Sequence, residues 1–286
     1  MLDTAPAPPH AAPSDSSADR PSLTLALAQC AHRSDGDALA LARDWCARAT
    51  DAGADLICFP ECLMTPFETE PDEYAASAEP ADGPFAQAIS ELARETGLWV
   101  VWTMNEADPD GGRPYNTAVV TSSSGETMSR YRKVHLFDSG TYQESSKMQA
   151  GSELPHVIET PWGRISAAIC YDLRFCELSR NLALEGAELV LFPSAWVAGP
   201  QKVEQWRALL AARAVENGMF AAGLSRAGGE YAASSAVYAP DGRAVALAGT
   251  GEELVVCILD LAEVRSAREA IPVLRHRRPE LYGSGA

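Results

Sequence analysis

Segments with helical spacing of apolar residues alternate with shorter apolar runs along most of this 286-residue chain. The helical spacing covers four segments, and a short helix is expected near the C-terminus. These segments are 37–51, 84–97, 174–185 and 202–217. The runs of strand length lie at 23–30, 55–59, 99–105, 116–123, 126–133, 163–169, 188–192, 219–224, 232–239, 243–248 and 253–259. Strands that alternate with helices, with antiparallel neighbours among them, predict an α/β fold with mixed sheets.

Two places interrupt this alternation. Ser123, Ser124 and Gly125 form a turn signal between two strands, which predicts a hairpin. The segment 134–155 has no clear period and contains Gly, Ser and Gln, so it is predicted to be a long loop. Loops of this length inside a compact domain are often functional.

One internal similarity bears on the architecture. The segment DAGADLICFPE at 51–61 resembles LEGAELVLFPS at 184–194. Both have a helix end, Gly-Ala, an acidic residue, a buried strand, Phe-Pro and a polar residue. The pattern favours two pseudo-symmetric halves with sheets stacked face to face. The alternative is that any two α/β units share such a pattern.

Composition bounds the function classes. Residues 1–21 contain five Pro and five Ala and predict a disordered tail, so we expect a single domain at 22–286. The tail lacks the features of a secretory signal, and no 18-residue uncharged apolar stretch occurs. The net charge of −16 argues against nucleic acid as a partner. Seven cysteines, an odd number, suit a reducing compartment, so a cytoplasmic location without membrane contact is expected.

Three side chains stand where extended apolar segments end: Glu61 in ICFPE, Lys133 in RYRKVHLF and Cys170 in ISAAICYDLRF. A carboxylate, an ammonium and a thiol are the parts of an acyl-transfer site. Cys170 is expected on a strand-to-helix turn, where free backbone N–H groups and the helix dipole favour the thiolate. Pro60 ends strand pairing before Glu61, and an apolar setting beside a thiol is expected to favour the neutral carboxyl group.

These three segments resemble those of the carbon–nitrogen hydrolase (nitrilase) superfamily, and the similarity covers about residues 22–284. It extends to FPSAW at 192–196, RAVEN at 213–217 and IPVLRHRRPELYG at 271–283. CYDLRF and RHRRPELYG look most like the amidase branch that contains omega-amidases and deaminated-glutathione amidases. True nitrilases usually carry Trp-Glu after the nucleophile, where this chain has Tyr171-Asp172. The resemblance implies a four-layer α-β-β-α sandwich of two mixed sheets, with the site at the strand ends.

The resemblance also implies roles for individual residues. Cys170 would be the nucleophile and Glu61 the base that takes and returns its proton. Lys133 and the backbone N–H of Tyr171 would stabilise the oxyanion. Glu144 would brace the lysine and orient the substrate.

Arg174 lies four residues after the nucleophile, on the same face if that stretch is helical, and is predicted to bind a substrate carboxylate. The alternative is that Arg174 forms a structural ion pair with Asp172 or Glu177. Ala233-Ser234-Ser235, Gln205-Trp206 and a slightly longer loop at 197–206 depart from the family pattern beside the pocket. The precise substrate therefore stays open.

The sequence also offers two other arrangements of site residues. His135 would share a strand face with Lys133 and offers a Cys-His dyad, although it also fits a hydrogen-bonded structural role. A metal site would need Cys58, Cys62, Cys170 and Cys176, whose spacing differs from that of paired zinc knuckles. No nucleotide-binding or zinc-protease motif occurs, so no metal and no cofactor are implied.

The expected activity is hydrolysis of the C–N bond of a small omega-amide of a dicarboxylic or 2-oxo acid, through a cysteine thioester. Deaminated glutathione is a close alternative substrate. A nitrilase or N-carbamoyl amidohydrolase is a second possibility, and a non-catalytic scaffold a third. A homodimer or higher oligomer is implied by the resemblance alone.

Overall fold

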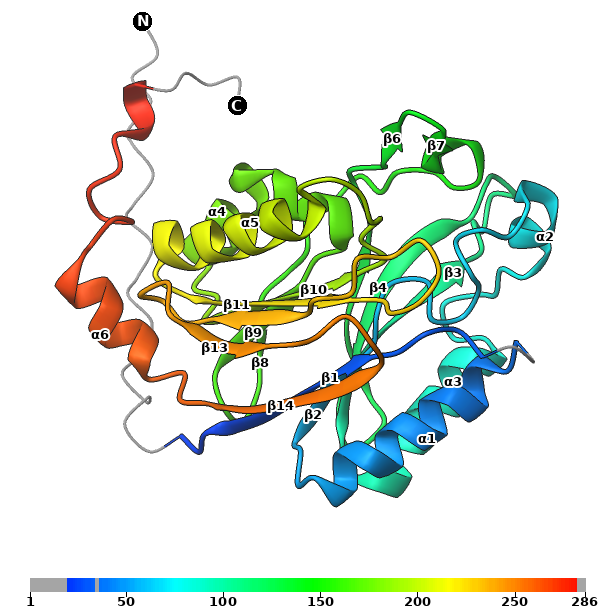
Figure 1. Ribbon diagram of the computed structural model, residues 1–286, viewed down its shortest axis with the longest axis horizontal. Helices are drawn as coiled ribbons and strands as arrows, with labels where there is room; N and C mark the ends of the chain where they lie inside the picture. The colour runs from blue at the N-terminus through cyan, green and yellow to red at the C-terminus, as the bar shows by residue number, and fades with distance from the viewer. Residues whose placement is uncertain (1–19, 34–35, 282–286) are drawn as a thin grey trace, which may run out of the picture.

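The computed structural model describes residues 20–33 and 36–281 and contains two six-stranded mixed sheets (Figure 1). The first sheet has the order β14-β1-β2-β3-β4-β5, and the second has the order β13-β12-β11-β10-β9-β8. The strands of the first sheet are β1 (Leu23–Gln29), β2 (Leu56–Cys58), β3 (Trp99–Glu106), β4 (Tyr115–Thr121), β5 (Thr127–Arg132) and β14 (Glu253–Leu259). Those of the second are β8 (Ile158–Glu159), β9 (Arg164–Ala167), β10 (Leu189–Ser194), β11 (Phe220–Ser225), β12 (Ala236–Tyr238) and β13 (Ala244–Leu247).

Helices cover the outer face of each sheet, so the molecule has four layers (Figure 1). The helices α1 (Ala38–Asp51) and α3 (Pro84–Thr96) pack on the first sheet, and α4 (Cys176–Leu184) and α5 (Lys202–Asn217) pack on the second. The short helices α2 (Pro71–Ala76) and α6 (Glu263–Ala270) lie outside these layers. The predicted four-layer α-β-β-α sandwich is confirmed.

Alternation along β1 shows how the sequence builds two apolar interfaces. Leu25 and Leu27 belong to the apolar cluster that both sheets share. Ala26 and Ala28 point the other way and pack with helix residues such as Trp45 of α1. Because successive side chains of a strand face opposite sides, one strand serves both interfaces. The small alanines on the helix side leave room for the large indole.

The two sheets have the same topology, as the internal similarity predicted. Each has a parallel trio (β1-β2-β3 or β9-β10-β11) flanked by one antiparallel strand on one edge and two on the other. Asp55 and Glu188 occupy equivalent places before the central strand. Each carboxylate accepts a backbone N–H from the neighbouring strand, that of Thr24 at 2.8 Å and that of Arg164 at 2.7 Å. The pseudo-symmetric arrangement therefore extends to individual hydrogen bonds.

Several boundaries differ from the predictions. The segment 134–155 is not an unstructured loop, because it contains the hairpin β6 (Asp138–Ser139) and β7 (Tyr142–Gln143) and a 3-10 turn at Glu144–Ser146. The predicted helix 174–185 begins only at Cys176, because extended backbone at Phe175 separates it from the 3-10 helix Cys170–Arg174. The helix α2 was not predicted. Apart from residues 20 and 21, the predicted tail lies outside the described residues, and no described helix is long and apolar enough to cross a membrane.

Candidate active site

Glu61 follows β2 and points into the space between the strand ends of the two sheets. Its Oε1 accepts hydrogen bonds from Lys133 Nζ and from Asn116 Nδ2, both at 2.8 Å. Its Oε2 accepts the backbone N–H of Ala195 at 2.8 Å, directly after β10. The carboxylate of the first half is thus held by a backbone donor of the second half.

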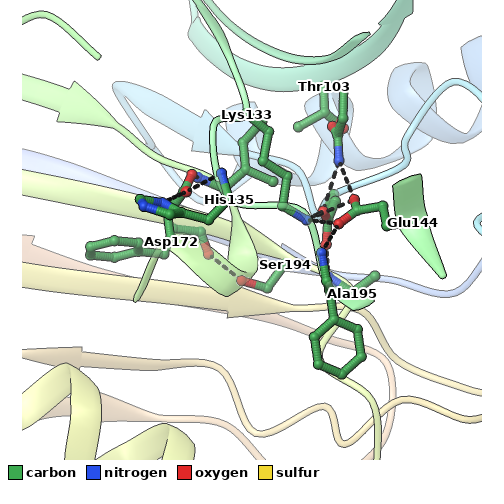
Figure 2. Close-up of polar contacts among 12 residues, drawn as sticks. Thr103, Lys133, His135, Glu144, Asp172, Ser194 and Ala195 are labelled. Atoms are coloured by element: carbon green, nitrogen blue, oxygen red, sulfur yellow. Dashed lines mark hydrogen bonds and ion pairs between the residues drawn. The ribbon is translucent and has the colours of Figure 1, made fainter. Parts of the chain in front are cut away.

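Lys133 is buried between two carboxylates. Its Nζ lies 2.7 and 2.8 Å from the two oxygens of Glu144, in addition to its contact with Glu61. Glu144 also accepts the backbone N–H of Phe137 at 2.6 Å and is fully buried. Figure 2 shows Lys133, Glu144 and Ala195 converging on one point. The predicted bracing of the lysine by Glu144 agrees with this geometry.

The charges in this cluster determine which groups are ionised. Burial favours the neutral acid at Glu61, but the charge of Lys133 and the hydrogen bonds from Lys133 and the Ala195 N–H together outweigh burial and hold the pKa of Glu61 below its usual value. Burial, reinforced by the charge of Glu61 and opposed by that of Lys133, raises the pKa of Glu144. Burial opposes the charge of Lys133, but Glu144 and Glu61 raise its pKa well above the usual value. The prediction that Glu61 favours its neutral form is therefore wrong.

Cys170 begins a 3-10 helix that is separated from the end of β9 by two residues, which agrees with the expected strand-to-helix turn. Its backbone has a φ of 46°, which a non-glycine residue rarely adopts. The following Asp172 caps the turn, because its Oδ2 accepts the N–H of Ile169 at 2.9 Å and the hydroxyl of Tyr131 at 2.8 Å. Residues held in such a strained conformation cluster at functional sites.

Cys170 is buried on the Glu61 side of the site, because it lines one pocket with Ala195, whose backbone N–H donates to Glu61. Burial and then the charge of Glu61 raise the pKa of Cys170 well above its usual value, although Lys133 acts in the opposite direction. The expectation of a resting thiolate is therefore wrong. The geometry instead suits transfer of the thiol proton to Glu61 when a substrate arrives.

The predicted substrate contacts lie around a small pocket beside the thiol. Tyr171 belongs to the first turn of the 3-10 helix, where backbone N–H groups have no acceptor inside the helix. Its ring packs edge-on against Phe137, with ring centroids 5.1 Å apart. The pocket is lined by Phe137, Cys170, Tyr171, Arg174, Ala195, Trp196, Val197 and Lys202.

Arg174 also lines the pocket, but it belongs to a different helix from the one predicted. It lies at the end of the 3-10 helix and not on α4, so the α-helical spacing argument is wrong. Its Nη2 donates to Gln205 Oε1 at 2.9 Å, and its guanidinium lies 4.8 Å from the ring centroid of Trp196. Neither Asp172 nor Glu177 pairs with it among the described ion pairs.

His135 is a structural residue in this arrangement. Its Nδ1 lies 2.7 Å from Asp172 Oδ1 (Figure 2). Its ring stacks on that of Phe175, with centroids 3.6 Å apart. β5 ends at Arg132, so Lys133 and His135 do not share a strand face as predicted. The Cys-His dyad is therefore not favoured. Within 20–33 and 36–281 no group of three or more His, Cys, Asp or Glu side chains is arranged to hold a metal ion, which disfavours the four-cysteine site.

Sequence reasoning missed three residues that hold the site together. Asn116 lies between Glu61 and Glu144, and Asp172 anchors the nucleophile turn. Arg226 is fully buried after β11, and its Nη2 donates to the backbone carbonyls of Glu61 at 2.7 Å and Cys62 at 3.0 Å. Asn116 alone left a signal, as a polar residue in a predicted buried strand. Arg226 is revealed only by contacts distant in sequence, and Asp172 by the capped turn and its contact with Tyr131.

Comparisons with known proteins identify the family of this chain. The carbon-nitrogen hydrolase family model matches residues 24–269. The chain is 33% identical over 246 residues to Omega-amidase NIT2 of Homo sapiens, covering 82% of this chain and 87% of the relative. It is 36% identical over 252 residues to Deaminated glutathione amidase of Rattus norvegicus, covering 82% of this chain and 76% of the relative.

A solved structure is also similar to this chain. A mutant of the amidase from Nesterenkonia sp. AN1, showing covalent addition of the acetamide moiety of fluoroacetamide at its active site cysteine, superimposes with a TM-score of 0.75 and 27% identity. The match covers 91% of this chain and 95% of that one. The family match and the two relatives together show that this chain belongs to the carbon–nitrogen hydrolase family.

Proposed function

We propose that this protein is an amidase that cleaves the C–N bond of a small non-peptide carboxamide through a thioester on Cys170 and releases ammonia. The observation that carries this proposal is that Cys170 lines one pocket with Ala195, whose N–H binds Glu61, the carboxylate that is paired with the buried Lys133. The names of the relatives, omega-amidase and deaminated glutathione amidase, support an amide substrate.

The geometry supports a two-stage reaction. Glu61 takes the thiol proton of Cys170, and the sulfur attacks the amide carbon. Lys133 and the backbone N–H of Tyr171 donate to the oxyanion that forms. The C–N bond then breaks, Glu61 returns the proton to the departing ammonia, and an acyl-thioester remains. Glu61 next takes a proton from water, and the hydroxide adds to the thioester carbon. The C–S bond then breaks, the carboxylic acid is released, and Glu61 returns the proton to the Cys170 thiolate.

The substrate proposed is an omega-amide of a dicarboxylic or 2-oxo acid, with Arg174 near the free carboxylate. Deaminated glutathione is the second candidate, since one relative carries that name. An N-carbamoyl amidohydrolase would release carbon dioxide as well as ammonia, and a nitrilase would turn over nitriles. We also propose a cytoplasmic homodimer or higher oligomer, which light scattering would test.

The decisive experiment is an ammonia-release screen over omega-amides, deaminated glutathione, carbamoyl amino acids and nitriles. The wild type is compared with Cys170→Ala on each compound. A brief incubation followed by acid quenching and intact-mass measurement would detect the acyl adduct on the wild type only. Equal ammonia release by both proteins on every amide would contradict the proposal.

A further inference from the structure

Two cationic side chains border the pocket beside the Cys170 thiol. Arg174 reaches it from the 3-10 helix that Cys170 begins, and Lys202 reaches it from the first turn of α5. The backbone at Lys202 is held in place, because the Lys202 carbonyl accepts the indole N–H of Trp196 at 3.0 Å. The two elements that carry these cations are distant in sequence, so the tertiary fold brings the positive charges together.

Neither cation has a carboxylate partner within the described part of the chain. Arg174 donates to the neutral amide of Gln205. The Lys202 ammonium lies over two aromatic rings, 5.5 Å from the centroid of Phe137 and 5.7 Å from that of Trp196. This is unusual in a chain with a net charge of −16, where acidic residues outnumber basic ones.

The two charges repel each other across the pocket. Burial, followed by the charge of Arg174, lowers the pKa of Lys202. A bound anion would offset this repulsion and raise the pKa of Lys202, because an opposite charge favours the charged form of an amine. Lys202 also contrasts with the other two lysines of the chain. Lys133 is paired with carboxylates, and Lys147 donates to two backbone carbonyls.

We infer that Lys202 determines specificity by binding the substrate carboxylate jointly with Arg174. The inference rests on the proposed amidase function and deepens it. The class of substrate it selects is an amide whose acyl group carries a carboxylate, because the aromatic rings give the acyl chain an apolar wall and the cations bind its far end. Lys202 lies in the segment 197–206, where the sequence departs from the family pattern beside the pocket.

The test compares two substrates of similar size, succinamic acid and its methyl ester. We expect the wild type to prefer the acid in kcat/KM. Lys202→Met should reduce that preference by roughly 10–100-fold, the size of a lost charge-assisted hydrogen bond, mainly through KM for the acid. Lys202→Arg should restore most of it. Arg243→Met removes one charge from an exposed ion pair elsewhere and serves as the control.

A binding measurement separates this inference from the proposed function. In the Cys170→Ala background, reductive methylation followed by mass spectrometry reports the accessibility of Lys202, and succinate should protect it. If succinate protected Lys202 but the wild type hydrolysed no amide, the amidase proposal would be contradicted and the binding role of Lys202 would stand. Active enzyme with an unchanged acid-to-ester ratio in Lys202→Met, or no protection by succinate, would overturn the role of Lys202.

Discussion

Cys30 and Cys170 occupy equivalent positions in the two halves of the molecule and have different surroundings. Leu25 of β1 and Ile165 of β9 pair with equivalent central-strand residues, and each cysteine lies five residues further on. Cys170 adopts a positive φ beside Glu61 and Lys133. Cys30 has no positive φ, and its carbonyl accepts the N–H of Ala227.

The comparison separates features that both halves share from features that the active site requires and only one half has. Both strand ends bury a thiol, and burial raises the pKa of each, to about 11 at Cys30. Only the second half has a 3-10 turn capped by Asp172, and only the first half has a glutamate after Phe-Pro. The first half therefore contributes the carboxylate and the second half the cysteine on its turn, and the candidate site lies where the two halves meet.

The largest expected effect comes from exchanging the two cysteines for alanine. Cys170→Ala should lower kcat by at least about 10⁴-fold, because the covalent route is lost. Cys30→Ala should keep kcat within about threefold and lower the free energy of unfolding by about 1 kcal/mol, because it only removes buried sulfur. Amide hydrolysis and urea unfolding measure these effects. Comparable loss of kcat in both variants would erase the distinction between the halves.

The next largest effect concerns Lys133, which is paired with both Glu61 and Glu144. Lys133→Met should lower kcat by about 10²–10⁴-fold, because an oxyanion donor is lost. It should also cost about 3–5 kcal/mol of stability at neutral pH, because two buried carboxylates lose their partner. Lys133→Arg keeps the charge and serves as the comparison.

The contribution of Glu61 to the pH dependence of stability should change sign in this variant. In the wild type the folded-state pKa of Glu61 is depressed, so its stabilisation is present above the unfolded pKa and is lost as the pH falls through the folded value. Without Lys133, burial raises the folded pKa. Stability should then increase as the pH falls toward that value. Urea unfolding at a series of pH values checks this, and an unchanged slope would contradict the assigned charges.

These residues show how far the sequence alone could reach. Glu61, Lys133 and Cys170 were predictable because each lies in a short motif at the end of an apolar run. Their ionisation was not, because the pKa of Glu61 depends on Lys133, 72 residues away in sequence. The predicted helix start at 174 failed because the cap formed by Asp172 produces a 3-10 turn first. Local pattern predicts the elements, and long-range contacts determine the chemistry.

A smaller effect tests the link between the halves. Arg226→Met removes the donors to the carbonyls of Glu61 and Cys62, and Cys62 itself has a φ of 60°. We expect a 10–100-fold fall in kcat, a change in KM below about threefold, and a stability loss of about 1–3 kcal/mol. Partial rescue of kcat by Arg226→Lys would indicate positioning of Glu61. An unchanged kcat in a destabilised Arg226→Met protein would leave Arg226 with a purely structural role.

The smallest effect compares the two equivalent carboxylates. Asp55→Ala and Glu188→Ala each remove an acceptor for a backbone N–H of the adjacent strand, which should cost about 1–3 kcal/mol. Glu188 also pairs with Arg20 at 2.9 Å, so its loss should destabilise slightly more and should depend more on salt. Both variants should keep kcat within about twofold, because neither carboxylate contacts the site. Thermal unfolding at low and high salt measures the difference. A large loss of kcat in only one variant would contradict this expectation and show that the two carboxylates are not equivalent in positioning the site.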